Sequence, residues 1–410
     1  MDGTRAGSRL VALRQSLSKV VLPLRAVPAW RDLQPAEVLM LTATYGQGHI
    51  QAARALAEAM AAVRPGIRTA SIDFFDLINP VFNAATRLAY IYSVRKAPVL
   101  WREFYERTAR IDPDSFLQQR LYHLGESALR RTIEATQARV VVSTHPTPGG
   151  VVAELHRDGK LWPEPALTVT VITDYVLHSQ WVHPSTGLYL ASCQDVADEL
   201  IERGIPASRI EVTGIPIRSG FRTPVEREAA RARWGLDAER PVVVMLIGAH
   251  GMMRGAVEAC RRLARLAEPL QLVVVAGFDR HLQATLEAEL AGSPHPVQVL
   301  GFVEDVPALM AASDVLGTKA GGLTVSEALA MGTCTVVYSP IPGQEEGNAA
   351  YLRRHDAAEV AGSPTELASI VEELLRTPER RRQLAERARR LGRPDAAMKA
   401  ASLILERGLP

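Results

Sequence analysis

Cysteine is scarce in this sequence. Its 410 residues include only Cys193, Cys260 and Cys334, and their spacing matches neither a zinc motif nor a disulfide framework. This scarcity excludes a disulfide-stabilised secreted scaffold and is typical of a protein of the reducing cytoplasm.

Long apolar runs are absent as well. No stretch approaches the about 18 uncharged apolar residues of a membrane-spanning helix, so no transmembrane segment is expected. Net charge is only +2, and we therefore expect no nucleic-acid partner. Apolar residues nevertheless make up 47% of the chain, which is typical of a globular protein, and the length favours two domains.

Apolar runs in the first half of the chain are followed by glycine turns or polar clusters. Glu37 to Thr42 precedes a glycine turn and an alanine-rich helical pattern from Ile50 to Val63. Arg139 to Ser143 and Leu167 to Thr173 also end at polar residues. Because the carboxyl ends of parallel strands share one edge of a sheet, these residues are expected to line a cleft. They are Gly46, Gly48, His49, His145, Asp174, His178 and Trp181.

The second half repeats this pattern. Pro241 to Ile247 runs into a glycine-bearing turn at residues 248–255, and Asp314 to Leu316 runs into Lys319-Ala320-Gly321-Gly322 and a helix start. A further short strand, Thr335 to Tyr338, is followed by a polar cluster. Glycine turns and helix N-termini suit a phosphate, so a nucleotide pocket is predicted. Its expected residues are Gly248, His250, Gly251, Lys319, Gly321, Gly322, Glu327, Gln344, Glu345 and Asn348.

Alternating strands and helices in both halves predict an α/β fold with two facing Rossmann-like domains and a cleft between them. The expected units are residues 36–220, residues 221–385 and a C-terminal helix over residues 386–410. Residues 1–35 form an N-terminal extension. Apolar residues and arginines alternate in it, and a helix at lipid headgroups, a packed extension and a disordered one all remain open.

Aromatic residues cluster between Phe74 and Tyr122. This segment holds ten of the 22 aromatic residues of the chain, interleaved with arginines. Aromatic rings and cations on helices are typical of a segment at a membrane interface, and amphipathic core helices explain the pattern equally well. The expected membrane residues are Phe82, Tyr90, Trp101, Phe104 and Tyr105.

Metal ligation is not expected. His145, His178 and His183 match no zinc-ligand spacing and lack supporting cysteines or carboxylates. Asp112-Pro113-Asp114 resembles a metal-binding DxD motif but follows a helical pattern, so we interpret it as a turn. No metal or other cofactor is therefore predicted.

Several motifs occur together in one order, and with them the chain resembles the monogalactosyldiacylglycerol synthase and processive diacylglycerol glucosyltransferase family. The resemblance covers residues 36–355. Its motifs are Tyr45-Gly46-Gln47-Gly48-His49, Thr144-His145-Pro146, Thr173-Asp174, Thr213-Gly214-Ile215-Pro216-Ile217-Arg218, Gly248-Ala249-His250-Gly251, Lys319-Ala320-Gly321-Gly322 and Pro342-Gly343-Gln344-Glu345.

This resemblance implies a GT-B glycosyltransferase whose last helix crosses back to the first, acceptor-binding domain. It implies an inverting transfer of glucose or galactose from a UDP-hexose to diacylglycerol, or to the glycolipid product, at an anionic membrane surface, without a metal. The enzyme would be peripheral, on the cytoplasmic face. His49 would be the catalytic base and Glu327 the ribose ligand, while Gln344 and Glu345 would lie near the donor sugar. The segment from Phe74 to Tyr122 would face the membrane.

Chemistry agrees with these assignments. An imidazole with an ordinary pKa near ~6.5 takes a proton at cytoplasmic pH, which suits His49. Helix N-termini at Gly248 to Gly251 and Lys319 to Gly322 would stabilise the leaving UDP.

The sequence departs from the family at Ala320, where a proline is usual, and residues 1–35 have no counterpart. Three alternatives remain: a lipid-linked peptidoglycan-precursor transferase, a UDP-sugar epimerase and a non-catalytic sugar-nucleotide sensor.

Overall fold

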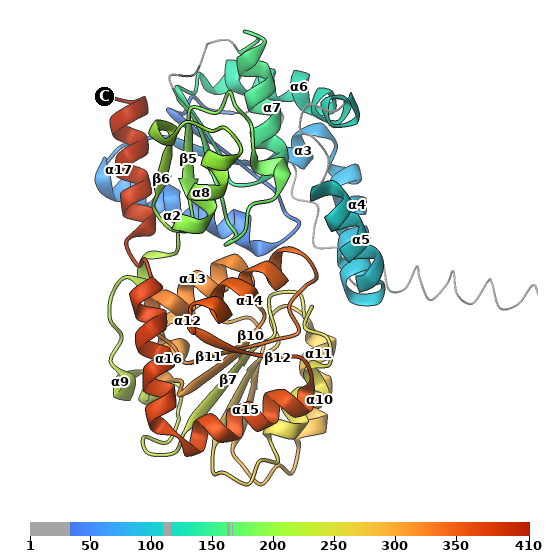
Figure 1. Ribbon diagram of the computed structural model, residues 1–410, viewed down its shortest axis with the longest axis vertical. Coiled ribbons are helices and arrows are strands. Elements are labelled where there is room, and N and C mark those ends of the chain that lie inside the picture. Colours follow the sequence, from blue (N-terminus) through green and yellow to red (C-terminus); the bar gives the residue numbers. More distant parts are fainter. Residues whose placement is uncertain (1–32, 110–115, 162–164, 166) are drawn as a thin grey trace, which may run out of the picture.

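The computed structural model describes residues 33–109, 116–161, 165 and 167–410. Figure 1 shows two α/β bodies stacked along the long axis of the molecule. Residues 1–32 of the extension and the Asp112-Pro113-Asp114 turn lie outside the described residues. None of the helices within those ranges is both long and apolar enough to cross a membrane.

The first body contains a six-stranded sheet in the order β2-β1-β3-β4-β5-β6, and all its neighbouring strands are parallel. Its central strands are rich in valine and leucine and are buried, as expected for a sheet covered on both faces. The strands are β1 Val38–Thr42, β2 Thr69–Asp73, β3 Val140–Ser143, β4 Leu167–Val171, β5 Leu188–Ala191 and β6 Ile210–Val212.

The second body contains a parallel sheet in the order β12-β11-β10-β7-β8-β9. In each sheet the direction of winding reverses once, between β1 and β3 in the first and between β7 and β10 in the second. Ligands of open α/β sheets bind beside such reversals, at the carboxyl ends of the strands. The strands are β7 Val242–Leu246, β8 Gln271–Val275, β9 Val297–Leu300, β10 Val315–Thr318, β11 Thr335–Tyr338 and β12 Ala358–Ala361.

Helices cover both faces of each sheet (Figure 1). Those of the first body are α2 Gln47–Val63, α3 Phe74–Ile78, α4 Pro80–Lys96, α5 Pro98–Ala109, α6 Phe116–Thr136, α7 Pro146–Arg157 and α8 Gln194–Glu202. The remainder are α9 Arg227–Arg233, α10 Ala256–Leu263, α11 Arg280–Leu290, α12 Val306–Ala312, α13 Gly322–Met331, α14 Gln344–Arg354, α15 Pro364–Arg376, α16 Pro378–Leu391 and α17 Ala396–Gly408. Short 3₁₀ turns lie at Ser179–Trp181, Ala207–Arg209 and Ser219–Phe221.

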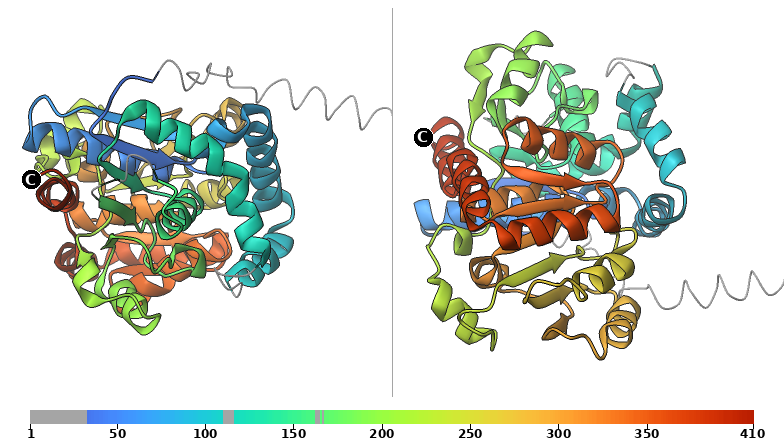
Figure 2. Two further views of the ribbon diagram at one scale, coloured as in Figure 1. Left: turned by 90° about the horizontal axis from the view of Figure 1, so that it is seen from above. Right: turned by 60° about the horizontal axis from the view of Figure 1, so that its bottom comes forward.

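The chain crosses between the bodies twice. It passes from β6 into the second body, where Ile217 and Phe221 join the core under β7. It returns after α16, and Ala400 and Ile404 of α17 pack into the first core against β1 and α2. Seen from above in Figure 2, α17 lies on the opposite side of the molecule from α4 and α5.

A shared apolar cluster joins the two bodies. The Tyr175 ring stacks on Tyr351 with centroids 4.7 Å apart, and its hydroxyl lies 2.8 Å from Ser326 Oγ. Gly322 touches the carbonyl of Thr173 so closely that a Cβ atom would collide with it. This contact therefore fixes the end of α13 against the strand end of β4.

Candidate active site

A cavity of about 870 Å³ lies between the two bodies and is lined by residues from both. It sits where both sheets reverse their winding, since the turns after β1, β3, β7 and β10 all reach it. Most of the residues predicted from the sequence line it. They are Gly46, Gly48, His49, His145, Asp174, His178, Trp181, Gly248, His250, Lys319, Gly321, Gly322, Glu327, Gln344 and Glu345.

His49 lies in the first turn of α2, directly after the glycine turn. Its Nδ1 atom is 2.6 Å from the carbonyl oxygen of Thr144 and 3.1 Å from Thr173 Oγ1. A carbonyl oxygen can only accept a hydrogen bond, so Nδ1 carries the proton. The lone pair is therefore on Nε2, which leaves this nitrogen able to accept a proton.

The electrostatic state of His49 differs from the ordinary value assumed from the sequence. Burial lowers its pKa to about 4, and the hydrogen bond to the Thr144 carbonyl opposes this shift only partly. The ring of His145 packs edge-on against it at 4.8 Å, and burial also lowers the pKa of His145. Both imidazoles are thus neutral near pH 7, and His49 is in its proton-accepting form.

Glu327 lies across the cavity on α13, with only 7% of its surface exposed. Burial raises the pKa of its carboxyl group to about 7, and the positive charge of Arg218 opposes the shift. Arg218 Nη2 is 3.8 Å from Glu327 Oε1, which is beyond hydrogen-bonding distance. No hydrogen bond from the described part of the chain reaches this carboxylate, so its oxygens can accept hydroxyl groups of a ligand.

Charges also meet at the floor of the cavity. Lys319 Nζ lies 2.8 Å from Glu345 Oε1, and the backbone N–H of Ile341 donates to Glu345 Oε2 at 2.8 Å. Gly248 approaches the Lys319 side chain so closely that a Cβ atom would lie 3.1 Å from Cε. Close beside them, Gln344 Oε1 is buried and has no partner among the described residues. These groups form a polar floor suited to a phosphorylated sugar.

Two predicted donor residues lie elsewhere. Asn348 is 0% exposed and does not line the cavity. It accepts from Tyr175 N at 2.7 Å and donates to the Asp174 carboxylate at 3.0 Å and to Ala320 O at 2.9 Å. The hydrogen bonds of its amide are made within the contact between the two bodies. The prediction that Asn348 binds the sugar nucleotide is therefore corrected. Gly251 also lies behind the lining, and its carbonyl accepts from Arg95.

The predicted membrane residues divide into two groups. Phe82 and Phe104 are 50% and 57% exposed, as a membrane contact requires. Phe104 also lines the cavity, as do the less exposed Tyr90, Trp101 and Tyr105. Tyr90 packs against Trp101 with centroids 4.9 Å apart. None of the 12 residues of α5 is buried, so this helix is not a core helix.

Sequence reasoning missed one wall of the cavity. Arg218, Phe302, Val303 and Val306 all line it. Residues 302–306 follow β9, so the rule that pockets form at the carboxyl ends of strands points to them too.

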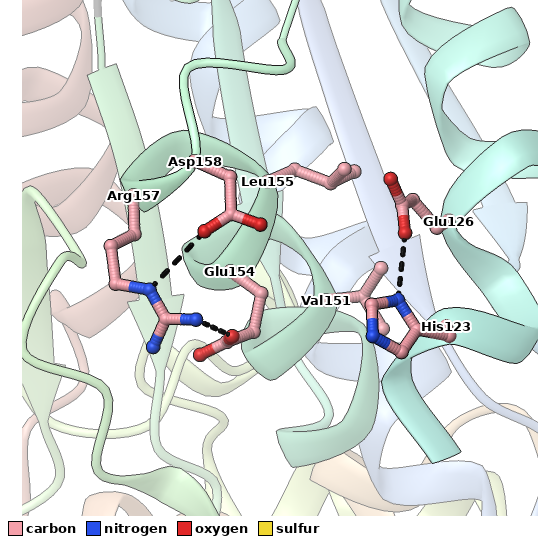
Figure 3. A pocket seen from close by; sticks show the side chains of 7 residues that line it. All are labelled: His123, Glu126, Val151, Glu154, Leu155, Arg157 and Asp158. Carbon is pink, nitrogen blue, oxygen red and sulfur yellow. Dashed lines mark hydrogen bonds and ion pairs between the residues drawn. The ribbon is translucent and has the colours of Figure 1, made fainter. Parts of the chain in front are cut away.

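A second hollow of about 170 Å³ lies on the first body, between α6 and α7 (Figure 3). Its charged groups pair with one another: His123 Nδ1 lies 2.9 Å from Glu126, and Arg157 bridges Glu154 and Asp158. These pairs are partly exposed and satisfied locally, so this hollow is a surface charge network rather than a rival active site. Across the described ranges, no group of three histidine, cysteine, aspartate or glutamate side chains is placed to hold a metal ion.

Comparison with known proteins agrees with this architecture. Residues 49–217 match the model of the monogalactosyldiacylglycerol (MGDG) synthase family, and residues 226–391 match that of glycosyl transferases group 1. A processive diacylglycerol beta-glucosyltransferase of Bacillus thuringiensis is 30% identical over 372 residues, which cover 90% of this chain and 93% of that protein. The Bacillus licheniformis protein of the same name is 30% identical over 82% of this chain and 86% of its own length.

Solved structures share the fold at low identity. MurG of Acinetobacter baumannii superposes with a TM-score of 0.57 at 18% identity, over 91% of this chain and all of that one. MnaA of S. aureus in complex with UDP gives a TM-score of 0.60 at 14% identity, over 90% and 96% of the two chains. The extent of the match to the Bacillus proteins decides the assignment. The chain belongs to the family of monogalactosyldiacylglycerol synthases and processive diacylglycerol glucosyltransferases, which are GT-B glycosyltransferases.

Proposed function

We propose that this protein transfers a hexose from a UDP-sugar to the free hydroxyl of diacylglycerol, with inversion at the anomeric carbon. The observation that carries the proposal is the cavity between the two bodies, with neutral His49 on one wall and, on the other, the buried carboxylate of Glu327, which accepts no hydrogen bond from the described residues. The names of the Bacillus relatives support diacylglycerol as acceptor and make glucose the first donor to test.

The second body would bind the nucleotide. Glu327 would accept hydrogen bonds from the ribose hydroxyls, and the apolar wall of Phe302, Val303 and Val306 offers a surface for the uracil ring. The diphosphate would lie at the turns after β7 and β10, where backbone N–H groups and the positive end of α13 favour an anion. Positive charge near these turns comes from Lys319 and from the arginines around His250. The pKa of His250 is lowered, first by burial and then by the charges of Arg87 and Arg95.

The hexose would lie over the polar floor, near Gln344 and Glu345. The acceptor oxygen would attack the anomeric carbon as the bond from that carbon to the diphosphate oxygen breaks. The acceptor proton would pass to Nε2 of His49, and UDP would leave with the bonding electron pair. Attack from the face opposite the leaving group inverts the configuration, which requires the base and the diphosphate on opposite walls.

The low pKa of His49 fits this sequence of events. In the free protein the ring is unprotonated and ready to accept. A UDP-sugar brings its negative diphosphate when it binds, and the leaving UDP gains further negative charge as the bond to the sugar breaks. Negative charge nearby raises the basicity of an imidazole. Proton transfer to a positioned histidine contributes about 10²- to 10⁴-fold to a rate.

The lipid acceptor would enter past α4 and α5. Exposed apolar side chains gather on these helices, and the inner face of the same helices lines the cavity. This arrangement supports a peripheral enzyme on the cytoplasmic face of an anionic membrane, with the mouth of the cavity against the lipid.

The decisive experiment is an assay with liposomes that contain diacylglycerol and either UDP-glucose or UDP-galactose. We expect a glycolipid whose linkage, determined by NMR, is β. Reactions with a lipid-linked peptidoglycan precursor and with UDP-N-acetylglucosamine alone separate the other two enzyme classes. Failure of every UDP-sugar to yield a diacylglycerol glycoside would refute the proposal.

A further inference from the structure

Helices α4 and α5 form a hairpin that touches the second body at two places. The first contact is made by Arg95, near the end of α4. Its Nη2 atom lies 2.7 Å from His250 O, 3.1 Å from Gly251 O and 2.6 Å from Asp279 Oδ2. Asp279 in turn caps α11 through its other oxygen. A single side chain of the first body thus holds two neighbouring turns of the second.

The second contact lies on α5. The Tyr105 ring packs on Gly343 so closely that no side chain fits there, and Gly343 has a φ of 92°, which favours glycine. Arg102 Nη2 lies 2.5 Å from Glu346 Oε1. These contacts hold the turn that presents Gln344 and Glu345 to the cavity.

Exposed apolar side chains are concentrated on the same hairpin, and two of them, Leu100 and Phe104, also line the cavity. Of the large exposed apolar side chains in the described residues, most are found here: Val81, Phe82, Tyr92, Val99, Leu100 and Phe104. One helical hairpin therefore connects a surface suited to lipid with the turns that border the donor half of the cavity.

We propose that this hairpin couples contact with a lipid surface to the binding of the sugar nucleotide, and that Arg95 is the positioning residue of the coupling. The proposal rests on the proposed function for the identity of the nucleotide. A hairpin held by lipid keeps Arg95 on the carbonyls of His250 and Gly251, which orients the N–H groups of that turn toward the diphosphate. Because linkage is reciprocal, bound nucleotide also strengthens the contact of the hairpin with lipid.

The test measures UDP binding by calorimetry, with and without vesicles of phosphatidylglycerol and diacylglycerol. We expect vesicles to tighten UDP binding to the unmodified protein by about fivefold or more. Arg95→Ala should weaken UDP binding about tenfold, as expected for loss of charged hydrogen bonds, and should abolish the vesicle effect. Arg107→Ala is the matched control, because Arg107 lies on the same hairpin, its side chain is 77% exposed, and among the described residues its ion-pair partner is Glu103 of its own helix.

Two further measurements separate positioning from simple loss of structure. Co-sedimentation of Arg95→Ala with vesicles in the absence of nucleotide should equal that of the control, because Arg95 points toward the second body. Asp279→Asn, which keeps an oxygen to cap α11, should reproduce part of the loss and should add little in combination with Arg95→Ala.

Equal UDP affinity in Arg95→Ala and Arg107→Ala would overturn the inference. So would a failure of vesicles to tighten UDP binding to the unmodified protein, or an equally strong tightening in Arg95→Ala. If no lipid is glycosylated but Arg95→Ala still removes the vesicle effect, the coupling stands and only the proposed acceptor fails.

Discussion

Replacing Glu327 by glutamine tests whether this buried carboxylate lowers the free energy of unfolding while it increases the affinity for UDP-glucose. The carboxyl pKa is about 7 in the folded protein, against 4.5 for an unperturbed glutamate. The folded state therefore holds the proton more tightly than the unfolded chain. The stability that goes with this proton is fully present below pH 4.5 and is lost as the pH rises through about 7. At about 1.4 kcal/mol per pKa unit, the buried charge costs roughly 3 kcal/mol at pH 8.

Glu327→Gln removes this charge and keeps the shape. We expect the variant to have a higher free energy of unfolding than the unmodified protein at pH 8, by up to roughly 3 kcal/mol, and an equal one near pH 4. Binding should change in the opposite direction, because an amide offers one acceptor where the carboxylate offers two. UDP-glucose affinity should fall about tenfold. In the unmodified protein, ionisation of Glu327 should make the affinity for UDP-glucose rise as the pH passes through about 7. In the variant, this affinity should no longer rise in that range.

The assays are urea unfolding followed by circular dichroism between pH 4 and pH 8, and calorimetry with UDP-glucose, whose diphosphate keeps the same charge over the upper part of this range. Glu406→Gln, at an exposed position of α17, is the control. If unfolding of the variant and of the unmodified protein had the same pH dependence, the carboxylate would not be the buried acid described here. Unchanged affinity for UDP-glucose would remove Glu327 from the ribose site.

Four further changes test other parts of the site. His49→Ala should lower kcat by about 10²- to 10⁴-fold with little change in UDP affinity. In the Glu327→Gln variant, which lacks the ionisation near pH 7, the acid limb of kcat/KM should reflect His49 and lie near pH 4 rather than near ~6.5. Asn348→Ala should lower the free energy of unfolding by about 2 to 3 kcal/mol, because it leaves buried groups of Tyr175 and Asp174 without a partner. Phe82→Ser with Phe104→Ser should reduce co-sedimentation with anionic vesicles. Removal of divalent metals by EDTA should leave the transfer rate unchanged.

Each of these has a contrary outcome. A parallel loss of UDP affinity and rate in His49→Ala would mark a binding residue rather than a base. An Asn348→Ala protein as stable as the unmodified one would mean that the contact between the bodies adds nothing to folding. Vesicle binding that survives both serine substitutions would place the lipid contact elsewhere. A rate restored by Mg²⁺ after EDTA would refute the metal-free mechanism.

The strands and their glycine turns were predictable. The apolar run at Pro241 to Ile247 became β7 Val242–Leu246, and the run before Lys319 became β10. These predictions succeeded because valine-rich runs bounded by glycine are read locally, and because parallel strands place their carboxyl ends together. The position of His49 at the cavity follows from the same rule, whereas Glu327, inside α13, was predicted from the family resemblance.

The aromatic segment was only half predictable. Its composition fits helices that contact lipid and amphipathic core helices equally well, and the family resemblance favours lipid contact. Phe82 and Phe104 are half-exposed, as lipid contact requires. The composition gives no means of separating them from Tyr90, Trp101 and Tyr105, because which face of a helix turns inward depends on what the helix packs against. Here that partner is the turn structure of the other body, which the segment itself does not encode.

What the sequence by itself determined is the local chemistry: two sets of parallel strands, glycine turns at their ends, and a histidine directly after the first of these turns. Tertiary structure alone decided how these groups behave. The carbonyl that sets the tautomer of His49 lies 95 positions away in the chain, and the carboxylate that holds Arg95 lies 184 positions away. Burial lowers the pKa of His49 and raises that of Glu327, and it arises only when such distant segments pack together and exclude water. The same packing pairs Asn348 with the other body instead of leaving it to bind a ligand.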